Sequence, residues 1–172
     1  PGHGESRGQG MDQVNDYARS VEAFIEAIQA PIPVPCGLSL GGAIAIQLLL
    51  NRKTTYRAGI LINTGARLKV LPEIFNMIRN DYSAYTEASH KMAASPHTEP
   101  GRPQAIAAEA KKCSAEVAYK DFSACNAFDV MGRLAEIAEP VLVLSAEDDL
   151  LTPPKYAQFL CKGIPGSKNV HI

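Results

Sequence analysis

The residues best suited to chemistry stand in the pattern Gly37-Leu38-Ser39-Leu40-Gly41. It follows a short apolar segment and precedes a helical run rich in small residues, 43–51. A serine in a tight turn between a strand and a helix projects its hydroxyl above the sheet edge, and small residues two places to either side let the two elements approach. We therefore predict that Ser39 is a nucleophile and that the backbone N–H of Leu40 faces the oxyanion, helped by the positive end of the helix. The alternative is a glycine-rich turn whose serine has no chemical role.

A second candidate group lies in residues 145–153, directly after another apolar run. Its carboxylates, Asp148 and Asp149, stand where a strand is predicted to end. A carboxylate in that place can orient a histidine from a neighbouring loop. From the residues alone, this role and that of solvated side chains near a helix start are equally favoured.

The elements that must position these residues alternate between helix and strand. Apolar residues at helical spacing predict an amphipathic helix over residues 11–30. Short apolar runs of strand length are found at residues 32–36, 58–63, 141–145 and 169–172. Continuous apolar strands between helices are typical of a parallel sheet covered on both faces, so we predict an α/β fold.

Two prolines bear on these elements. Pro35 lies inside the first predicted strand, where it removes a ladder donor, so that strand is short or Pro35 occupies a position that needs no N–H. Thr152 is predicted to cap a helix that has Pro153 at its first position and ends at Gly163. The apolar face of this helix is predicted to consist of Tyr156, Phe159 and Leu160.

The stretch between Gly65 and Glu139 has helical patterns at residues 71–78, 105–112 and 122–134 and no convincing strand. We interpret it as a helical insertion between two parallel strands. The predicted organisation is one partial domain, 1–172, in which residues 1–65 and 139–172 form the core and residues 66–138 form a helical lid.

Composition excludes several classes of function. The chain has 172 residues and a formal net charge of −1, with no basic patch of the kind that binds nucleic acid. Its longest apolar run, 43–50, is far shorter than the roughly 20 residues that a membrane span needs. The four cysteines are scattered without metal-ligand spacing, which predicts reduced thiols, a cytoplasmic location, and no metal or cofactor.

Three motifs in this order resemble signatures of the α/β-hydrolase superfamily: Pro1-Gly2-His3-Gly4-Glu5-Ser6, Gly37-Leu38-Ser39-Leu40-Gly41-Gly42 and Asp149-Leu150-Leu151-Thr152-Pro153. Within it, Cys36-Gly37-Leu38-Ser39 and Ile62-Asn63-Thr64 are similar to the carboxylesterase and 3-oxoadipate enol-lactonase branch. The resemblance implies an α/β-hydrolase fold with a helical lid inserted between two strands. It implies a serine hydrolase that cleaves a small-molecule ester or lactone through a Ser-His-Asp triad and an acyl-enzyme intermediate. Ser39 would be the nucleophile, Asp149 the acid, and the N–H of Leu40 half of the oxyanion hole.

The same resemblance places two parts outside this chain. The triad histidine is expected beyond Ile172, and the second oxyanion donor before Pro1. His171 falls within the last predicted strand, which does not suit a loop-borne base. His3 is expected to be structural, and His90 and His97 to lie on the surface of the lid. We therefore expect the 172-residue polypeptide alone to be inactive and to fold poorly, with one sheet edge unpaired.

Two further readings stay open. A lactonase whose substrate bears a carboxylate predicts a cation in the pocket, for which Arg67, Arg79 and Arg133 are candidates. A non-hydrolytic member of the fold, such as a binding module or a cofactor-free peroxidase or lyase, is the alternative of another class. In either case, the predicted apolar pocket over the serine is lined by lid residues Phe75, Met77, Tyr82, Tyr85 and Met92.

Overall fold

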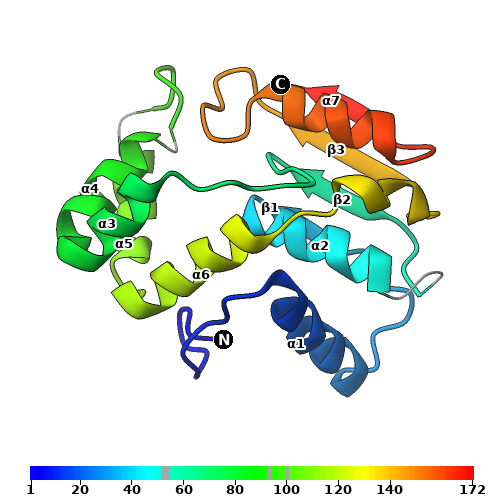
Figure 1. Ribbon diagram of the computed structural model, residues 1–172, viewed down its shortest axis with the longest axis horizontal. Coiled ribbons are helices and arrows are strands. Elements are labelled where there is room, and N and C mark those ends of the chain that lie inside the picture. Colours follow the sequence, from blue (N-terminus) through cyan, green and yellow to red (C-terminus); the bar gives the residue numbers. More distant parts are fainter. Residues whose placement is uncertain (52–54, 93, 100) are drawn as a thin grey trace.

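The computed structural model describes residues 1–51, 55–92, 94–99 and 101–172, without the side chains of residues 90–92. Its centre is a four-stranded parallel sheet with the order β1-β2-β3-β4 (Figure 1). Every strand pairs in parallel with the next one along the chain. The predicted α/β parallel sheet is therefore confirmed. The strands are β1 (Cys36–Leu38), β2 (Gly59–Ile62), β3 (Val141–Ser145) and β4 (Lys168–His171).

Three helices pack around this sheet. α2 (Leu40–Asn51) packs against β1 and β2, and α1 (Val14–Ala27) packs on α2. α7 (Pro154–Gly163) packs against β3 and β4. Because α2 is buried nearly all round, its sequence is apolar throughout rather than striped. The largest fully buried side chains at these contacts include Ile46, Leu49, Leu61, Val143 and Leu160.

The first strand differs from its prediction. It begins at Cys36, so the strand predicted over residues 32–36 is placed too early. Pro35 precedes it and contributes only its carbonyl, which accepts a hydrogen bond from the N–H of Ile60 at 2.9 Å. The missing donor of Pro35 is thus not needed, because the paired strand is short and starts after it.

The start of α7 also differs. The N-cap residue is Pro153, which makes no side-chain cap, and Thr152 donates its hydroxyl to Asp149 instead of capping the helix. Ala157 and Leu160 are the residues that α7 buries, whereas Phe159 is 40% exposed. The predicted apolar face was therefore wrong at Phe159, one residue before the buried Leu160.

Between β2 and β3 the chain is helical, as predicted. This insertion contains α3 (Pro72–Asn80), α4 (Tyr82–Met92), α5 (Arg102–Ala110), α6 (Ala115–Ala127) and the 3₁₀-helix η1 (Met131–Glu136). Figure 1 shows α3, α4 and α5 grouped beside the sheet, with α6 leading back toward it. The single helix predicted over residues 122–134 was wrong. α6 ends at Ala127, and Phe128 is its C-cap. The extended segment that follows pairs with the loop after β2, where the N–H of Val130 donates to the carbonyl of Ala66 at 2.8 Å.

Candidate active site

Ser39 occupies the single turn residue between β1 and α2. Its φ angle is 51°, a left-handed conformation that non-glycine residues seldom adopt. Two neighbours hold the backbone there: the N–H of Ser39 donates to the carbonyl of Ile62 at 3.0 Å, and its carbonyl accepts the Thr64 hydroxyl at 2.7 Å. Its side chain is exposed at the end of the strand. The strand–turn–helix context expected of a nucleophile is present.

The glycines around Ser39 do not all serve the close approach that the sequence suggested. A Cβ on Gly37 would lie 2.0 Å from the carbonyl oxygen of Gly41, so only glycine fits where β1 meets α2. A Cβ on Gly42 would lie 2.5 Å from the side chain of Thr64. A Cβ on Gly41 would meet no described atom within 4 Å. The tight packing therefore depends on Gly37 and Gly42, while Gly41 contributes its backbone.

Asp149 is fixed in the loop after β3 by its own hydrogen bonds. Its Oδ1 accepts the N–H groups of Leu151 and Thr152, both at 2.8 Å, and its Oδ2 accepts the Thr152 hydroxyl at 2.7 Å. A carboxylate has about four acceptor positions, so Oδ2 keeps one for a further donor. Asp148 is exposed and accepts the hydroxyl of Ser95 at 2.5 Å. The two neighbouring aspartates thus differ: Asp149 binds groups of its own loop, whereas Asp148 binds Ser95 of the helical insertion.

Ser39 opens onto two cavities. The first, of about 320 Å³, has both Ser39 and Asp149 in its wall, together with Asn63. We call it the polar cavity. The side chain of Asn63 helps to build it, because its Oδ1 accepts the N–H of Ala146 at 3.1 Å and ties the end of β2 to the loop that carries Asp149.

The second cavity, of about 340 Å³, extends from Ser39 under the insertion. We call it the apolar cavity. Its walls come from the loop after β2, from α3, α4 and α6, and from the loop before α7. Its lining residues include Leu68, Val70, Ile74, Phe122, Cys125 and Tyr156. Burial raises the pKa of the Cys125 thiol to about 12, and burial likewise raises the pKa of the Tyr85 hydroxyl, so both groups stay neutral in this wall at ordinary pH.

The lining of the apolar cavity differs from the predicted lining at most positions. Of the five predicted residues, Tyr85 lines the apolar cavity, and Met92 lies outside the described side chains. Phe75 instead packs against Tyr119, with ring centroids 5.2 Å apart, and Tyr82 stacks on Tyr85 at 5.8 Å. The first pair joins α3 to α6, and the second lies within α4. Phe75, Met77 and Tyr82 do not line the cavity.

The predicted cations lie elsewhere. Arg67 pairs with Asp129 at 3.8 Å, Arg79 packs over the ring of Tyr119, and Arg133 binds Glu136. None of them lines either cavity at Ser39. Lys69 does line the apolar cavity, and its ammonium donates to the carbonyl of Asn126 at 2.8 Å. Nothing in the sequence around Lys69 distinguishes it, since its position depends on how the insertion folds over the sheet.

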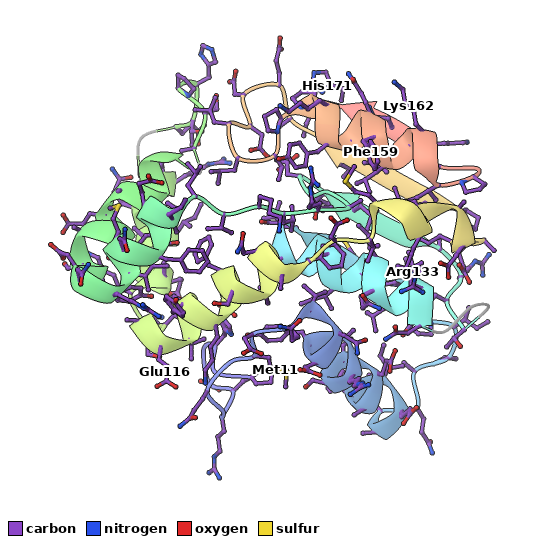
Figure 2. The ribbon with its side chains drawn as sticks, viewed as in Figure 1. Met11, Glu116, Arg133, Phe159, Lys162 and His171 are labelled. Carbon is purple, nitrogen blue, oxygen red and sulfur yellow. The ribbon has the colours of Figure 1, made fainter. Side chains whose placement is uncertain are left out.

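None of the three histidines whose side chains are described lines these cavities. His171 lies in β4, where its Nδ1 is 3.1 Å from the hydroxyl of Ser145, and Figure 2 shows it at the end of the sheet beside α7. His3 contacts Asp121, and His97 is exposed, as predicted. The side chain of His90 lies outside the described residues. In the part of the chain that is described, no helix is long and apolar enough to cross a membrane.

Comparison with known proteins agrees with this geometry. The profile of the Alpha/beta hydrolase family matches residues 1–170. A pimeloyl-[acyl-carrier protein] methyl ester esterase from Nitrosospira multiformis is 25% identical over 179 residues, which cover 93% of this chain and 68% of the esterase. A solved thermophilic esterase is 31% identical with a TM-score of 0.84, covering 100% of this chain and 68% of its own.

A third similar protein is Est816, described as an N-acyl homoserine lactone degrading enzyme. It is 26% identical with a TM-score of 0.84, covering 99% of this chain and 71% of its own. The family profile covers nearly the whole chain, and the sheet, the turn at Ser39 and the helical insertion are all in place. This chain belongs to the Alpha/beta hydrolase family.

Proposed function

We propose that the protein hydrolyses carboxylic esters with Ser39 as nucleophile. The observation that carries the proposal is the position of Ser39: its strained turn lies between a polar cavity that it shares with Asp149 and an apolar cavity that can hold an acyl group. The similar proteins named as esterases support the same bond type.

In the proposed reaction, the hydroxyl of Ser39 attacks the ester carbonyl and transfers its proton to an imidazole in the polar cavity. The alcohol leaves with that proton, and water then releases the acid from the acyl-enzyme. Asp149 would use the free acceptor position of its Oδ2 to hold the imidazole. The resemblance to the α/β-hydrolase superfamily implies that this imidazole belongs to a segment beyond Ile172, and the proposal adopts that assignment.

The oxyanion would be held in part by the N–H of Leu40, the first residue of α2. Amides in the first turn of a helix have no partner within the helix and lie at its positive end. One such donor contributes about 3 kcal/mol to transition-state stabilisation in other hydrolases. The insertion helices would act as the lid, and the size of the apolar cavity suits small to medium acyl groups. The four free cysteines support a cytoplasmic location.

Substitution of the two candidate residues in the whole protein tests this function. We expect Ser39→Ala to lower kcat/KM for p-nitrophenyl esters by at least about 10⁴-fold and Asp149→Asn by about 10³-fold or more. The matched control is Asp148→Asn, one residue away in the wall of the same polar cavity, which should stay within about three-fold of wild type because its carboxylate accepts the hydroxyl of Ser95 and holds no part of the Asp149 loop. Equal losses at both aspartates would contradict the assignment of the acid. Binding of esters without turnover would instead favour the non-hydrolytic reading.

A lactone that carries a carboxylate is the second candidate substrate, and Lys69 is the observation that favours it. Among the described residues that line the apolar cavity, Lys69 is the one with a cationic side chain, and one similar protein is described as an N-acyl homoserine lactone degrading enzyme. Lys69→Met keeps the aliphatic stem and removes the charge. It should raise KM at least about ten-fold for a carboxylate-bearing lactone and leave KM for a neutral ester unchanged. Equal effects on both substrates would argue against a carboxylate subsite. Arg79→Met, on an arginine that lines neither cavity, is the control.

A further inference from the structure

Three metal-ligand side chains from distant parts of the chain converge beneath the insertion. One ring nitrogen of His3, the Sγ of Cys113 and a carboxylate oxygen of Asp121 all lie within 4.8 Å of one another, and the Nε2 of His3 is 2.7 Å from Oδ2 of Asp121. His3 belongs to the N-terminal segment, Cys113 to the link between α5 and α6, and Asp121 to α6. In the described part of the chain this is the one place where three such side chains meet. None of them lines the cavities at Ser39.

The imidazole of His3 and the carboxylate of Asp121 are each oriented by a second hydrogen bond, made by the atom that faces away from the cluster. The Nδ1 of His3 lies 3.0 Å from the carbonyl of Pro1, which can only accept, so Nδ1 carries a proton and Nε2 is the nitrogen directed at the cluster. The second oxygen of Asp121 accepts the hydroxyl of Tyr17 at 2.5 Å, and that hydroxyl accepts the N–H of Met11 at 2.9 Å. A carbonyl behind a histidine and a donor behind a carboxylate are the usual outer partners of metal ligands.

We propose that His3, Cys113 and Asp121 form a divalent metal site of the zinc type, which ties the N-terminal segment to the helical insertion. A mixed set of imidazole nitrogen, thiolate and carboxylate is typical of Zn²⁺, with water as the fourth ligand. In a tetrahedral site, bonds of about 2.0–2.3 Å place the donor atoms roughly 3.3–3.7 Å apart. The 2.7 Å contact between Nε2 and Asp121 would open by about half an ångström as the metal replaces the shared proton, and the sulfur would move inward.

The N-terminal segment that carries His3 packs closely on the helix that carries Asp121. A Cβ on Gly2 would lie 2.8 Å from the side chain of Val117, and one on Gly10 would lie 3.2 Å from it, so the N-terminal segment rests on the first turns of α6. Figure 2 labels Met11 in the N-terminal segment and Glu116 in the first turn of α6. This packing keeps His3 close to Asp121 before any metal binds.

The electrostatics of the cysteine give metal binding a measurable signature. Without metal, the thiol of Cys113 donates to the carbonyl of Ser114 at an S–O distance of 3.6 Å, so the sulfur carries a proton. A divalent cation reverses the sign of the local charge and deprotonates the thiol, so binding releases a proton and its affinity rises with pH.

Cobalt titration of the purified whole protein, stripped with a chelator and kept reduced, tests the proposal without reference to hydrolysis. We expect one equivalent of Co²⁺ to bind and to produce a thiolate-to-cobalt charge-transfer band. Cys113→Ser should abolish the band. His3→Gln and Asp121→Asn should weaken Co²⁺ binding at least ten-fold. The matched controls are Cys36→Ser and Cys161→Ser, which should keep both the band and the affinity.

A thermal measurement with Zn²⁺ gives an independent readout. Zn²⁺ should raise the Tm of wild type and of the two control variants, and it should leave the Tm of Cys113→Ser unchanged. Near-UV circular dichroism checks that each variant is folded. We expect His3→Gln to fold normally, because the side chain of His3 is half exposed. A charge-transfer band that survives Cys113→Ser, or a wild-type protein that shows neither band nor Tm shift, would overturn the proposal. The cluster would then hold only the hydrogen bond between His3 and Asp121.

Discussion

At Ser39 the backbone is held at φ 51°, a conformation that costs a non-glycine residue about 1–3 kcal/mol. Ile62 and Thr64, from the neighbouring strand and its loop, supply the hydrogen bonds that maintain it. The turn position of Ser39 and the loop position of Asp149 could be predicted because each stands in a short local pattern, while their catalytic roles stay a prediction. The contacts of Thr64 and Lys69 could not be predicted, because both depend on which distant segments come to lie beside them.

The thiol of Cys125 allows a prediction at the scale of a single residue. Burial raises its pKa from 9.0 to about 12, so at pH 8 its thiolate is about a thousand-fold scarcer than that of an unperturbed cysteine. We expect iodoacetamide to alkylate Cys125 about 10³-fold more slowly than glutathione at pH 8, with the rate rising about ten-fold per pH unit up to about pH 12. Mass spectrometry of the modified peptides over time measures both rates. Alkylation of Cys125 as fast as glutathione would show that the wall of the apolar cavity is open to solvent.

The same shift bears on stability, and its sign follows from proton binding. Between pH 9 and 12 the folded thiol keeps its proton while the unfolded thiol loses it. The folded state therefore binds more protons, and the free energy of unfolding falls as pH rises through this window.

At the scale of elements, the close approach of β1 to α2 depends on the absence of a Cβ at Gly37. A methyl group on Gly37 would lie 2.0 Å from a backbone oxygen of α2, whereas one on Gly41 would meet no described atom. Neither glycine has a positive φ angle, so the two positions differ in space and not in backbone conformation.

We therefore expect Gly37→Ala to lower the free energy of unfolding by about 3 kcal/mol or more, because a backbone contact cannot yield as a side chain can. Gly41→Ala should change it by less than about 1 kcal/mol, since alanine also favours the helix. Urea denaturation of both variants in the whole protein measures the difference. Equal destabilisation would mean that segments outside residues 1–172 fill the space around Gly41.

The strands and helices of the core could be predicted from their apolar patterns, within a few residues at each end. Where a predicted helix start or helix end was wrong, a contact with a residue outside that helix had overridden the local sequence preference. Asp149 takes up the hydroxyl of Thr152, which the sequence assigned to a helix cap. Pairing of Val130 with Ala66 ends the helix that the pattern extended to residue 134. The loops at these points respond to contacts that lie far away in the sequence.

At the scale of the whole molecule, the alternation of apolar strands and helices predicted a parallel α/β sheet, and the resemblance of three ordered motifs implied the α/β-hydrolase fold; both are confirmed. Neither was enough to predict the cavities. Their walls combine the loop after β2, the insertion and the loop before α7, and helical patterns do not say how an insertion packs against a sheet. The organisation into a core and a lid of residues 66–138 stays a prediction. The buried positions of Leu134 and Ile137 show that the end of the insertion packs in the same core as the sheet.

The open side of β1 leads to a prediction for the 172-residue polypeptide produced on its own. β1 lies at the end of the described sheet, pairs only with β2, and exposes Cys36 and 60% of Leu38. An apolar strand with an unpaired backbone edge recruits other chains. We expect this polypeptide to self-associate in reducing buffer, with a weight-average mass that rises with concentration in analytical ultracentrifugation.

A charge on the open strand should oppose this association. Cys36→Lys places a lysine on β1, the device by which natural edge strands avoid pairing, and should shift the association toward monomer by at least about ten-fold in concentration. Ala23→Lys adds the same charge to an exposed position of α1 and should leave the association unchanged. If both variants reduce it equally, net charge and not the β1 edge governs solubility. If the parent polypeptide is monomeric at every concentration, the edge is protected by its own twist and shortness.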